Sequence, residues 1–216
     1  RTPMHGVLSY AELCERQLAK PVPNIEKMQK FIRTIRRSGD SMLAQVNALL
    51  DLARLEGGVD FDAFVDVDVG RSVDRIVDEL QGWAMSKSVR VSASGPQVQL
   101  DGDDKLLAQL WRNLIGNAVK FSPENSEVTV SWATQDEDVV LVVRDAGPGV
   151  PVDELESIFD KFAQSSRTKT GAGGTGLGLS IARRIAEQHQ GRLWAENNTQ
   201  GGGASFCAQL PLRYAS

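Results

Sequence analysis

Asp145-Ala146-Gly147-Pro148-Gly149 ends a hydrophobic run, Val139 to Val143, that is typical of a buried strand. A carboxylate directly after such a strand lies at the rim of a sheet, where a ligand can reach it. The glycines that follow carry no Cβ atom, so a flat ring can approach the backbone closely. This stretch therefore predicts a pocket for a nucleotide base.

A second glycine-rich stretch, Gly174-Thr175-Gly176-Leu177-Gly178-Leu179, opens directly into a predicted helix, Ser180 to Gln188. Free N–H groups and the positive end of the helix dipole suit a polyphosphate. Either glycine stretch alone would be weak evidence, because turns use glycine freely. Together they describe a nucleotide site with one pocket for a base and one cradle for phosphates.

A predicted helix over residues 105–120 supplies a third element. Asn113, Asn117 and Lys120 are spaced by four and then three residues, which puts their side chains on one helical face. Amide oxygens are hard neutral ligands that suit Mg²⁺ bound together with phosphate oxygens, and a lysine ammonium can meet those phosphates. Alone, this could be a surface helix with ordinary polar residues, but its occurrence with both glycine stretches favours a metal–phosphate site. The buried side of the helix is predicted to consist of Leu106, Leu110, Leu114 and Ala118.

Composition narrows the class of protein. A net charge of −4 with interspersed signs argues against a nucleic-acid-binding protein, which usually has a basic face. The two cysteines lie far apart and without metal-ligand spacing, so we interpret them as reduced thiols in a reducing compartment. No apolar run approaches the length of a membrane span. We expect a cytoplasmic chain that would meet a membrane only through parts absent from it.

The fold class predicted from the order of the segments is α+β. Residues 1–20 and 25–55 read as two helices with a narrow apolar stripe, which favours pairing with a second copy as a four-helix-bundle dimer. The alternative is that both helices pack against the rest of the same chain. After Gly57-Gly58 strands and helices alternate, so we expect a hairpin domain over 1–57 and an α/β-sandwich domain over 61–214.

The elements predicted within the second domain follow from period and turn residues. Helices are expected at 69–85, 105–120, 153–159 and 180–188, and strands at 61–67, 89–93, 98–100, 128–133, 139–144, 191–196 and 204–210. Asp103 or Asp104 is expected to cap the second of these helices.

Five motifs in this order resemble the sensor histidine kinases of two-component systems, and the resemblance covers essentially the whole chain. Arg1-Thr2-Pro3-Met4 is similar to the tail of their H box, whose usual form is His-Glu-x-Arg-Thr-Pro. The other four are the N box at Asn113–Phe121, the first glycine box at Asp145–Gly149, the F box at Ile158–Phe162 and the second glycine box at Gly174–Leu179.

The resemblance implies a dimerising hairpin that carries the phosphoacceptor histidine and an ATP-binding domain shared with Hsp90-like ATPases. Such a core binds Mg-ATP, transfers the γ-phosphoryl group in line to an imidazole nitrogen, and relays it to an aspartate of a response regulator receiver domain. The implied cofactors are ATP and Mg²⁺, and the implied partners are a second copy of the chain and the receiver domain.

The resemblance also implies roles for single residues. Asn117 would bind Mg²⁺, Asn113 would order the metal–phosphate shell, and Lys120 would meet phosphate. Asp145 would accept a hydrogen bond from the adenine amino group. The other residues expected to contact ATP are Phe121, Gly147, Gly149, Phe159, Phe162, Gly174, Thr175, Gly176, Leu177, Gly178 and Leu179, with residues 163–173 as a lid.

The chain departs from the family pattern at its start. The acceptor histidine is expected just before Arg1, outside this chain, and His5 reads as a helix-surface residue. Thr2 occupies the position that assists dephosphorylation of the regulator, and Asn113, Lys120 and Thr2 are the predicted catalytic residues. Without the histidine, a kinase-like scaffold that binds ATP but does not phosphorylate itself is the alternative. A chaperone or topoisomerase fragment of the same superfamily is disfavoured by Arg1-Thr2-Pro3 and the F box.

Overall fold

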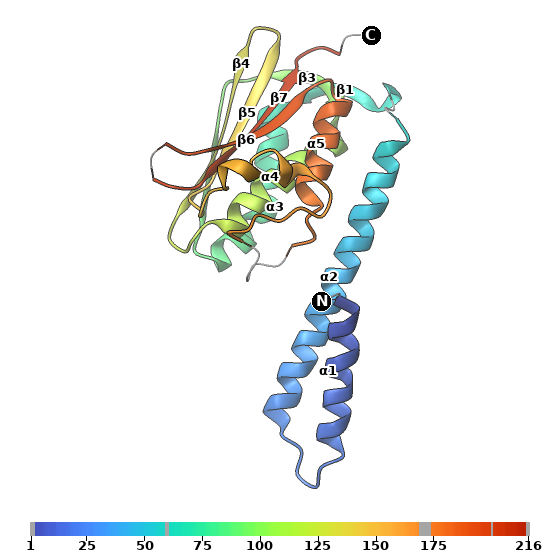
Figure 1. Ribbon diagram of the computed structural model, residues 1–216. Coiled ribbons are helices and arrows are strands. Elements are labelled where there is room, and N and C mark those ends of the chain that lie inside the picture. Colours follow the sequence, from blue (N-terminus) through green and yellow to red (C-terminus); the bar gives the residue numbers. More distant parts are fainter. Residues whose placement is uncertain (1–2, 59–60, 169–173, 200, 215–216) are drawn as a thin grey trace. The chain divides into compact units, whose positions relative to one another are not determined.

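The computed structural model describes residues 3–58, 61–168, 174–199 and 201–214 (Figure 1). Contacts divide the chain into two compact units, Arg1–Leu50 and Asp51–Ser216. The division falls inside the second helix, and Leu52 and Leu55, which follow it, are buried. Thr2 lies outside the described residues, so its predicted role stays a prediction.

The first unit is a helical hairpin. Its helices are α1 (Pro3–Leu18) and α2 (Ile25–Glu56), whose last turns belong to the second unit. Asn24 caps α2 as predicted, since its Oδ1 atom accepts a hydrogen bond from the Lys27 N–H group at 2.9 Å. The two helices face each other through Tyr10 and Phe31, whose ring centroids are 5.6 Å apart.

Apolar side chains of the hairpin are left exposed by this chain. Ile32 and Val46 of α2 are 55% and 50% exposed. Other large exposed apolar side chains on the two helices are Met4, Leu8, Leu13, Leu18, Ile25, Leu43, Leu49 and Leu50. A row of this kind on a long helix is what a partner helix covers in a bundle.

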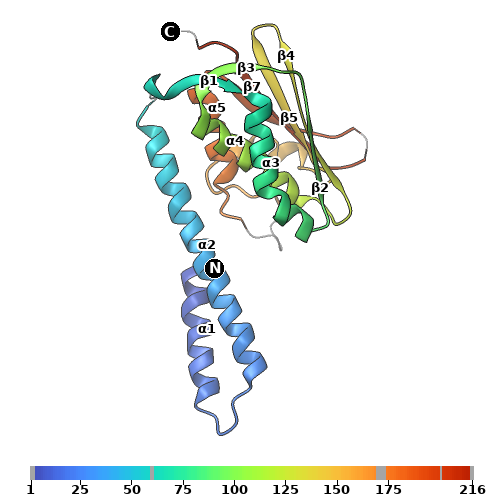
Figure 2. The ribbon, with the colours of Figure 1, turned by 180° about the vertical axis from the view of Figure 1, so that it is seen from behind.

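The second unit is a sheet covered on one face by helices. The five-stranded sheet has the order β2-β4-β5-β7-β6, in which β2 and β4 are parallel and the other pairs antiparallel. Helices α3, α4 and α5 lie on the same face of this sheet in both views (Figures 1 and 2). The strands are β2 (Arg90–Ser94), β4 (Glu127–Gln135), β5 (Asp138–Arg144), β6 (Arg192–Asn197) and β7 (Ala204–Pro211), and the helices are α3 (Val69–Ser86), α4 (Asp104–Phe121) and α5 (Gly178–Gln188).

Alternation explains how the sheet meets its helices. In β4, Val128, Val130 and Trp132 are buried, whereas the residues between them are exposed.

The start of α4 is fixed by a capping residue. Asp103 caps this helix, since its carboxylate accepts hydrogen bonds from the N–H groups of Lys105 and Leu106 at 2.8 and 3.2 Å. This cap determines where the helix carrying the predicted polar face begins.

Two predicted elements differ from the structure. The segment expected as a strand over 61–67 begins as a 3₁₀ turn, Phe61–Ala63, and β1 spans Phe64–Asp68, because only those residues pair with β3 (Gln99–Asp103). The helix expected over 153–159 is two 3₁₀ turns, Val152–Glu154 and Ser157–Phe159, each closed by a hydrogen bond three residues back.

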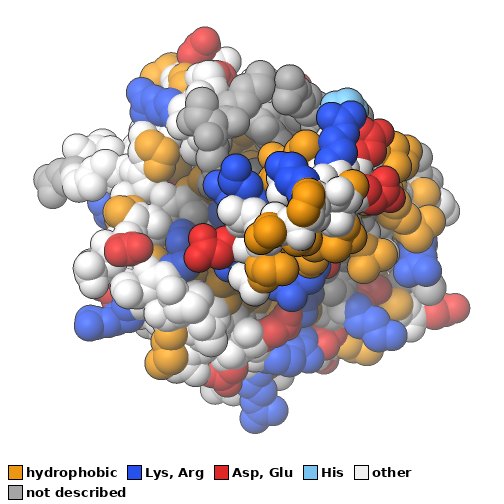
Figure 3. All heavy atoms as spheres, turned by 90° about the horizontal axis from the view of Figure 1, so that it is seen from below, with side chains coloured by type: hydrophobic (Ala, Val, Ile, Leu, Met, Phe, Trp, Pro, Cys, Tyr) orange, Lys and Arg blue, Asp and Glu red, His pale blue; other side chains and the backbone are white. Residues whose placement is uncertain are grey.

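The surface of the protein mixes both signs of charge. On the face shown in Figure 3, acidic and basic side chains are interspersed, in keeping with the modest net charge of the chain. Within the part of the chain that is described, no helix combines the length and apolar character needed to cross a membrane.

His189 joins the C-terminal end of α5 to β3 and is buried. Its Nδ1 atom donates to the Ile185 carbonyl oxygen at 2.8 Å, so its Nε2 atom is the acceptor for the Asp103 N–H group at 3.1 Å. The ring also stacks on Phe64 with centroids 5.0 Å apart. These bonds require a neutral imidazole, and burial lowers the pKa of His189 from its ordinary value of 6.5 despite the opposing effects of Ile185 and Asp103.

The pKa of His189 sets the direction of a pH effect on folding. Because the unfolded chain binds the proton more readily, the contribution of His189 to stability is full above about pH 6.5 and declines as the pH falls below it. We expect that His189→Gln removes this component, so the free energies of unfolding of parent and variant converge as the pH is lowered. Urea unfolding at several pH values measures it, with the exposed His5 replaced in a His5→Gln control. Parallel pH curves for parent and His189→Gln would contradict this account.

Candidate functional site

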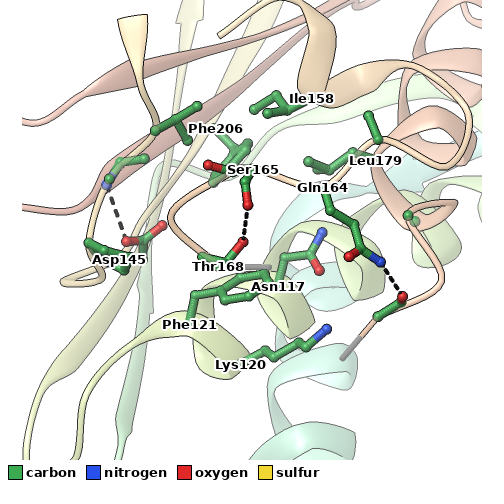
Figure 4. Close-up of a pocket in the computed structure, with 18 of the residues that line it drawn as sticks. Asn117, Lys120, Phe121, Asp145, Ile158, Gln164, Ser165, Thr168, Leu179 and Phe206 are labelled. Atoms are coloured by element: carbon green, nitrogen blue, oxygen red, sulfur yellow. Dashed lines mark hydrogen bonds between the residues drawn. The ribbon is translucent and has the colours of Figure 1, made fainter. Parts of the chain in front are cut away.

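A cavity of about 220 Å³ opens between α4, the end of β5 and the start of α5 (Figure 4). Its walls come from segments that are far apart in the sequence. Lining residues are Asn117, Lys120, Phe121, Asp145, Pro148, Gly149, Val150, Ile158, Ala163, Gln164, Ser165, Thr168, Gly174, Thr175, Gly176, Gly178, Leu179, Ala204 and Phe206. Both glycine stretches and the polar face of the predicted helix therefore meet at one place.

Asp145 is the buried anion of this cavity and is 6% exposed. Its Oδ1 atom accepts hydrogen bonds from the N–H groups of Gly147 and Ala204 at 2.7 and 3.1 Å. The other carboxylate oxygen is turned toward the cavity (Figure 4). Burial raises the pKa of Asp145, and the bonds from Gly147 and Ala204 oppose that shift. The carboxylate thus presents one oxygen as an acceptor at a fixed position.

Glycines allow the backbone to close around Asp145. A Cβ atom on Gly147 would lie 2.9 Å from both the Asp145 Oδ1 atom and the Phe121 carbonyl oxygen, which is too close for any side chain. A Cβ atom on Gly203, where φ is +83°, would overlap the carbonyl oxygen of Asp145. Asn198 completes the enclosure, since its Nδ2 atom donates to that carbonyl at 2.8 Å.

The polar face of α4 meets the glycine loop and the first turn of α5. A Cβ atom on Gly178 would be 3.6 Å from the Asn113 Oδ1 atom and 3.8 Å from the Asn117 Nδ2 atom. A Cβ atom on Gly174 would be 2.5 Å from the Lys120 Nζ atom. The N-terminal end of α5, where N–H groups have no intrahelical acceptor, therefore lies beside two amides, and the glycine loop before it lies beside an ammonium group. This arrangement suits an anion such as a phosphate.

The donor set also fits a hard cation that arrives with its own oxygens. Among the described residues, no cluster of three or more His, Cys, Asp or Glu side chains could hold a metal by itself. Asn117 lines the cavity, and the Nδ2 atom of Asn113 one turn earlier is buried without a hydrogen-bond partner. Amide oxygens next to a phosphate cradle match Mg²⁺, which takes substrate phosphate oxygens among its ligands.

Lys120 places a positive charge beside this cradle. Burial lowers the pKa of Lys120, and the neighbouring cation Lys87 lowers it further. The ammonium also lies 4.8 Å from the ring centroid of Phe121. A cation that is partly desolvated in this way gains by meeting an anionic ligand.

Apolar side chains form another part of the cavity wall. Ile158, Leu179 and Phe206 face the cavity together with the ring of Phe121 (Figure 4). The described part of the predicted lid lines the cavity through Ala163, Gln164, Ser165 and Thr168. Arg167 in the same segment donates to the Pro148 carbonyl oxygen at 2.7 Å. A slot with apolar walls and one buried acceptor suits a planar heterocycle.

Most of the predicted binding residues line the cavity, and five do not. Asn113 is one helical turn before Asn117, and Gly147 packs against Asp145 and the Phe121 carbonyl. Leu177 is fully buried in the core. Those predicted residues that line the cavity are Asn117, Lys120, Phe121, Asp145, Gly149, Gly174, Thr175, Gly176, Gly178 and Leu179.

Neither phenylalanine of the F box lines the cavity, so their predicted contact with a ligand stays a prediction. Phe159 is 2% exposed and packs edge-on against Phe206, with the Arg183 guanidinium 4.6 Å from its ring centroid. Phe162 is 59% exposed and has a φ of +66°. Phe159 therefore packs against a side chain of the cavity wall, whereas Phe162 is exposed to solvent.

Some lining residues were not predicted. Ala204 and Phe206 belong to β7, and the antiparallel register that pairs Arg144 with Ser205 carries them to the Asp145 turn. The sequence signal was the glycine run 201–203, which permits the close approach, but strand pairing cannot be derived from it. Pro148, Val150 and Ile158 lie within or beside the quoted motifs, and their side chains complete the wall.

Two family sequence models match this chain. The model described as "Histidine kinase-, DNA gyrase B-, and HSP90-like ATPase" matches residues 102–214, and the "His Kinase A (phospho-acceptor) domain" matches residues 1–58. Among curated proteins, the sensor protein kinase PmrB of Pseudomonas aeruginosa is 30% identical over 98% of this chain and 43% of its own length. The sensor histidine kinase AruS of the same species is 34% identical over 100% of this chain and 22% of its own length. The chain thus spans less than half the length of these two relatives.

Solved structures share the fold. Full-length ShkA in complex with AMPPNP is 29% identical, with a TM-score of 0.73 over 100% of this chain and 44% of ShkA. The mycobacterial sensor histidine kinase MprB is 26% identical, with a TM-score of 0.63 over 70% of this chain and 99% of that one. ThkA in complex with the response regulator TrrA has a TM-score of 0.77 over 97% of this chain and 58% of ThkA, and at 19% identity it shows the fold alone.

The glycine run beside Asp145 offers a matched test of close packing. Gly201 and Gly203 both have positive φ, but only at Gly203 would a Cβ atom meet the Asp145 carbonyl, whereas Gly201 faces open space. We expect Gly203→Ala to lower the free energy of unfolding by about 1–3 kcal/mol more than Gly201→Ala, since only the former overpacks the wall. Urea denaturation of both variants measures the difference, and equal losses would show that the enclosure of Asp145 is not tight.

Proposed function

Since the chain belongs to the sensor histidine kinases of two-component systems, we propose that it is the catalytic core of such a kinase, which binds Mg-ATP and transfers the γ-phosphoryl group to a histidine. The histidine is expected upstream of Arg1, and the phosphoryl group passes on to an aspartate of a response regulator. The core acts in the cytoplasm and as a homodimer.

One observation carries the proposal: the buried acceptor Asp145 and the cationic, amide-bearing face of α4 line the same cavity. ATP has a base with an amino group at one end and negatively charged phosphates at the other. A site for it therefore needs a hydrogen-bond acceptor at one end and positive charge at the other. Asp145 accepts from the adenine amino group, while Phe121 and Phe206 enclose the ring. The ShkA structure, which holds AMPPNP in the same fold, supports this assignment.

The phosphate end is built from Lys120 and the start of α5. Lys120 and the free N–H groups near Gly178 neutralise charge on the phosphate oxygens, and Asn117 is the protein ligand of Mg²⁺, with Asn113 behind it. When bound, Mg²⁺ neutralises charge that develops on the transferring phosphoryl group. Phosphoryl transfer depends mainly on such positioning and charge neutralisation, so no covalent role of these residues is required.

The hairpin is the part of the chain that binds the protein partners. Its exposed apolar residues, including Ile32 and Val46, are covered by the hairpin of a second copy. The match of residues 1–58 to the phospho-acceptor domain supports this role, and ThkA, whose fold this chain shares, is solved with a response regulator. Thr2 would act there in dephosphorylation of the regulator.

Asp145→Asn tests base recognition. The variant can still accept from Gly147 and Ala204 through its Oδ1 atom, but it turns an NH₂ group toward the cavity, where the adenine amino group also donates. We expect ATP to bind about 10- to 100-fold more weakly, which corresponds to losing one charge-assisted hydrogen bond. Calorimetry measures the affinity, with the exposed Asp153→Asn as control. Equal binding of ATP and GTP by the parent would contradict the role of Asp145.

Asn117→Ala tests the metal ligand. We expect Mg²⁺ to strengthen ATP binding by the parent but to have little effect in the variant, since the protein ligand to the metal is gone. Adenosine, which carries no phosphate, should bind both proteins equally, and sedimentation equilibrium should find both dimeric. An undiminished effect of Mg²⁺ in Asn117→Ala would refute the metal assignment.

A further inference from the structure

The C-terminal end of α4 is held by a lysine that directly follows another helix. Lys87 follows α3, and its Nζ atom donates to the carbonyl oxygens of Val119, Lys120 and Ser122 at 2.8, 2.6 and 3.4 Å. Two of these carbonyls belong to the last turn of α4, where an α-helix has no donor of its own. An ammonium group has three N–H donors and a positive charge that suits the negative end of a helix dipole. Lys87 therefore caps α4.

The backbone around Lys87 is itself tied in place. The Lys87 N–H group donates to the Ala84 carbonyl at 3.0 Å, which closes the end of α3. Ser88 has a φ of +55°, and its carbonyl accepts from the Asn125 N–H group at 2.8 Å, so this turn is bound to the loop after α4. The ammonium group is thus presented to α4 from a fixed backbone rather than from a free chain end.

The segment that Lys87 holds forms the floor of the nucleotide cavity. Lys120 and Phe121 line the cavity, whereas Lys87 does not. The Phe121 carbonyl oxygen packs under Gly147, and the Ser122 Oγ atom accepts from the Ala146 N–H group at 3.4 Å. A shift at the end of α4 would therefore move the turn that carries Asp145 as well as the Phe121 ring.

We propose that Lys87 is a positioning residue of the nucleotide site. By binding three carbonyl oxygens at the end of α4, it fixes Phe121 and Ser122 against Ala146 and Gly147 and keeps the pocket open to a purine ring. This inference rests on the proposed nucleotide-binding function. Without Lys87, a smaller fraction of the protein has the pocket in the conformation that binds a nucleotide. The apparent affinity for the nucleotide falls in proportion to that fraction.

Binding of AMPPNP to the full chain tests the proposal. Lys87→Met keeps the aliphatic stem but removes the charge and donors, and we expect its dissociation constant to rise about tenfold. Lys87→Arg, which keeps both features, should stay within about threefold of the parent. Lys105→Met replaces an exposed lysine at the other end of α4 and should bind like the parent. Calorimetry also gives the stoichiometry, which stays unchanged in Lys87→Met if the residue positions the site, and falls if it serves only to keep the protein folded.

Hydrogen exchange without any nucleotide separates this inference from the proposed function. We expect faster exchange in Lys87→Met over residues 119–123 and 145–149 and unchanged exchange over 185–189 at the end of α5. Should the parent fail to bind AMPPNP, the proposed function fails, while the exchange still decides whether Lys87 fixes the floor of the cavity. Unchanged exchange over 145–149, or an unchanged dissociation constant in Lys87→Met, would overturn the proposal.

Discussion

Close contact between two strand ends is the constraint on which the site depends. The register of β5 and β7 brings the Ala204 N–H group within 3.1 Å of the Asp145 carboxylate, and Gly203 must lack a side chain for this approach. One carboxylate oxygen is thereby occupied and the other faces the cavity. Because Asp145 is buried and accepts hydrogen bonds from two backbone N–H groups, its carboxylate is held in one orientation.

Helices α4 and α5 connect that site to the proposed phosphate-binding end of the cavity and to the rest of the unit. The first turn of α5 meets the amides of α4, while its last residues bind elsewhere. Gln188 donates to the carbonyls of Leu55 and Gly58, and His189 bonds to β3. A single short helix therefore links the phosphate end of the cavity to the last turn of α2. Lys87 likewise connects α4 to α3, because it follows α3 and donates to carbonyl oxygens at the end of α4.

The sequence was sufficient for the order of elements and for the motifs that meet at the cavity, because strand alternation and the spacing of Asn113, Asn117 and Lys120 are local properties. The sequence was not sufficient to predict which other residues form the walls of the cavity. Ala204 and Phe206 reach the cavity only through strand register, and the F box phenylalanines carry no local signal that separates a supporting residue such as Phe159 from a lining one. The cap by Lys87 joins residues about thirty positions apart through backbone carbonyls, which leave no trace in side-chain identity.

A crystal structure of the protein soaked with Mg²⁺ and a non-hydrolysable ATP analogue tests the central claim most directly. The account predicts the adenine amino group within hydrogen-bond distance of Asp145, the metal on Asn117, and the phosphates between Lys120 and the first turn of α5. Electron density for the analogue at any other place on the protein, with the cavity between α4 and Asp145 left without it, would contradict the account.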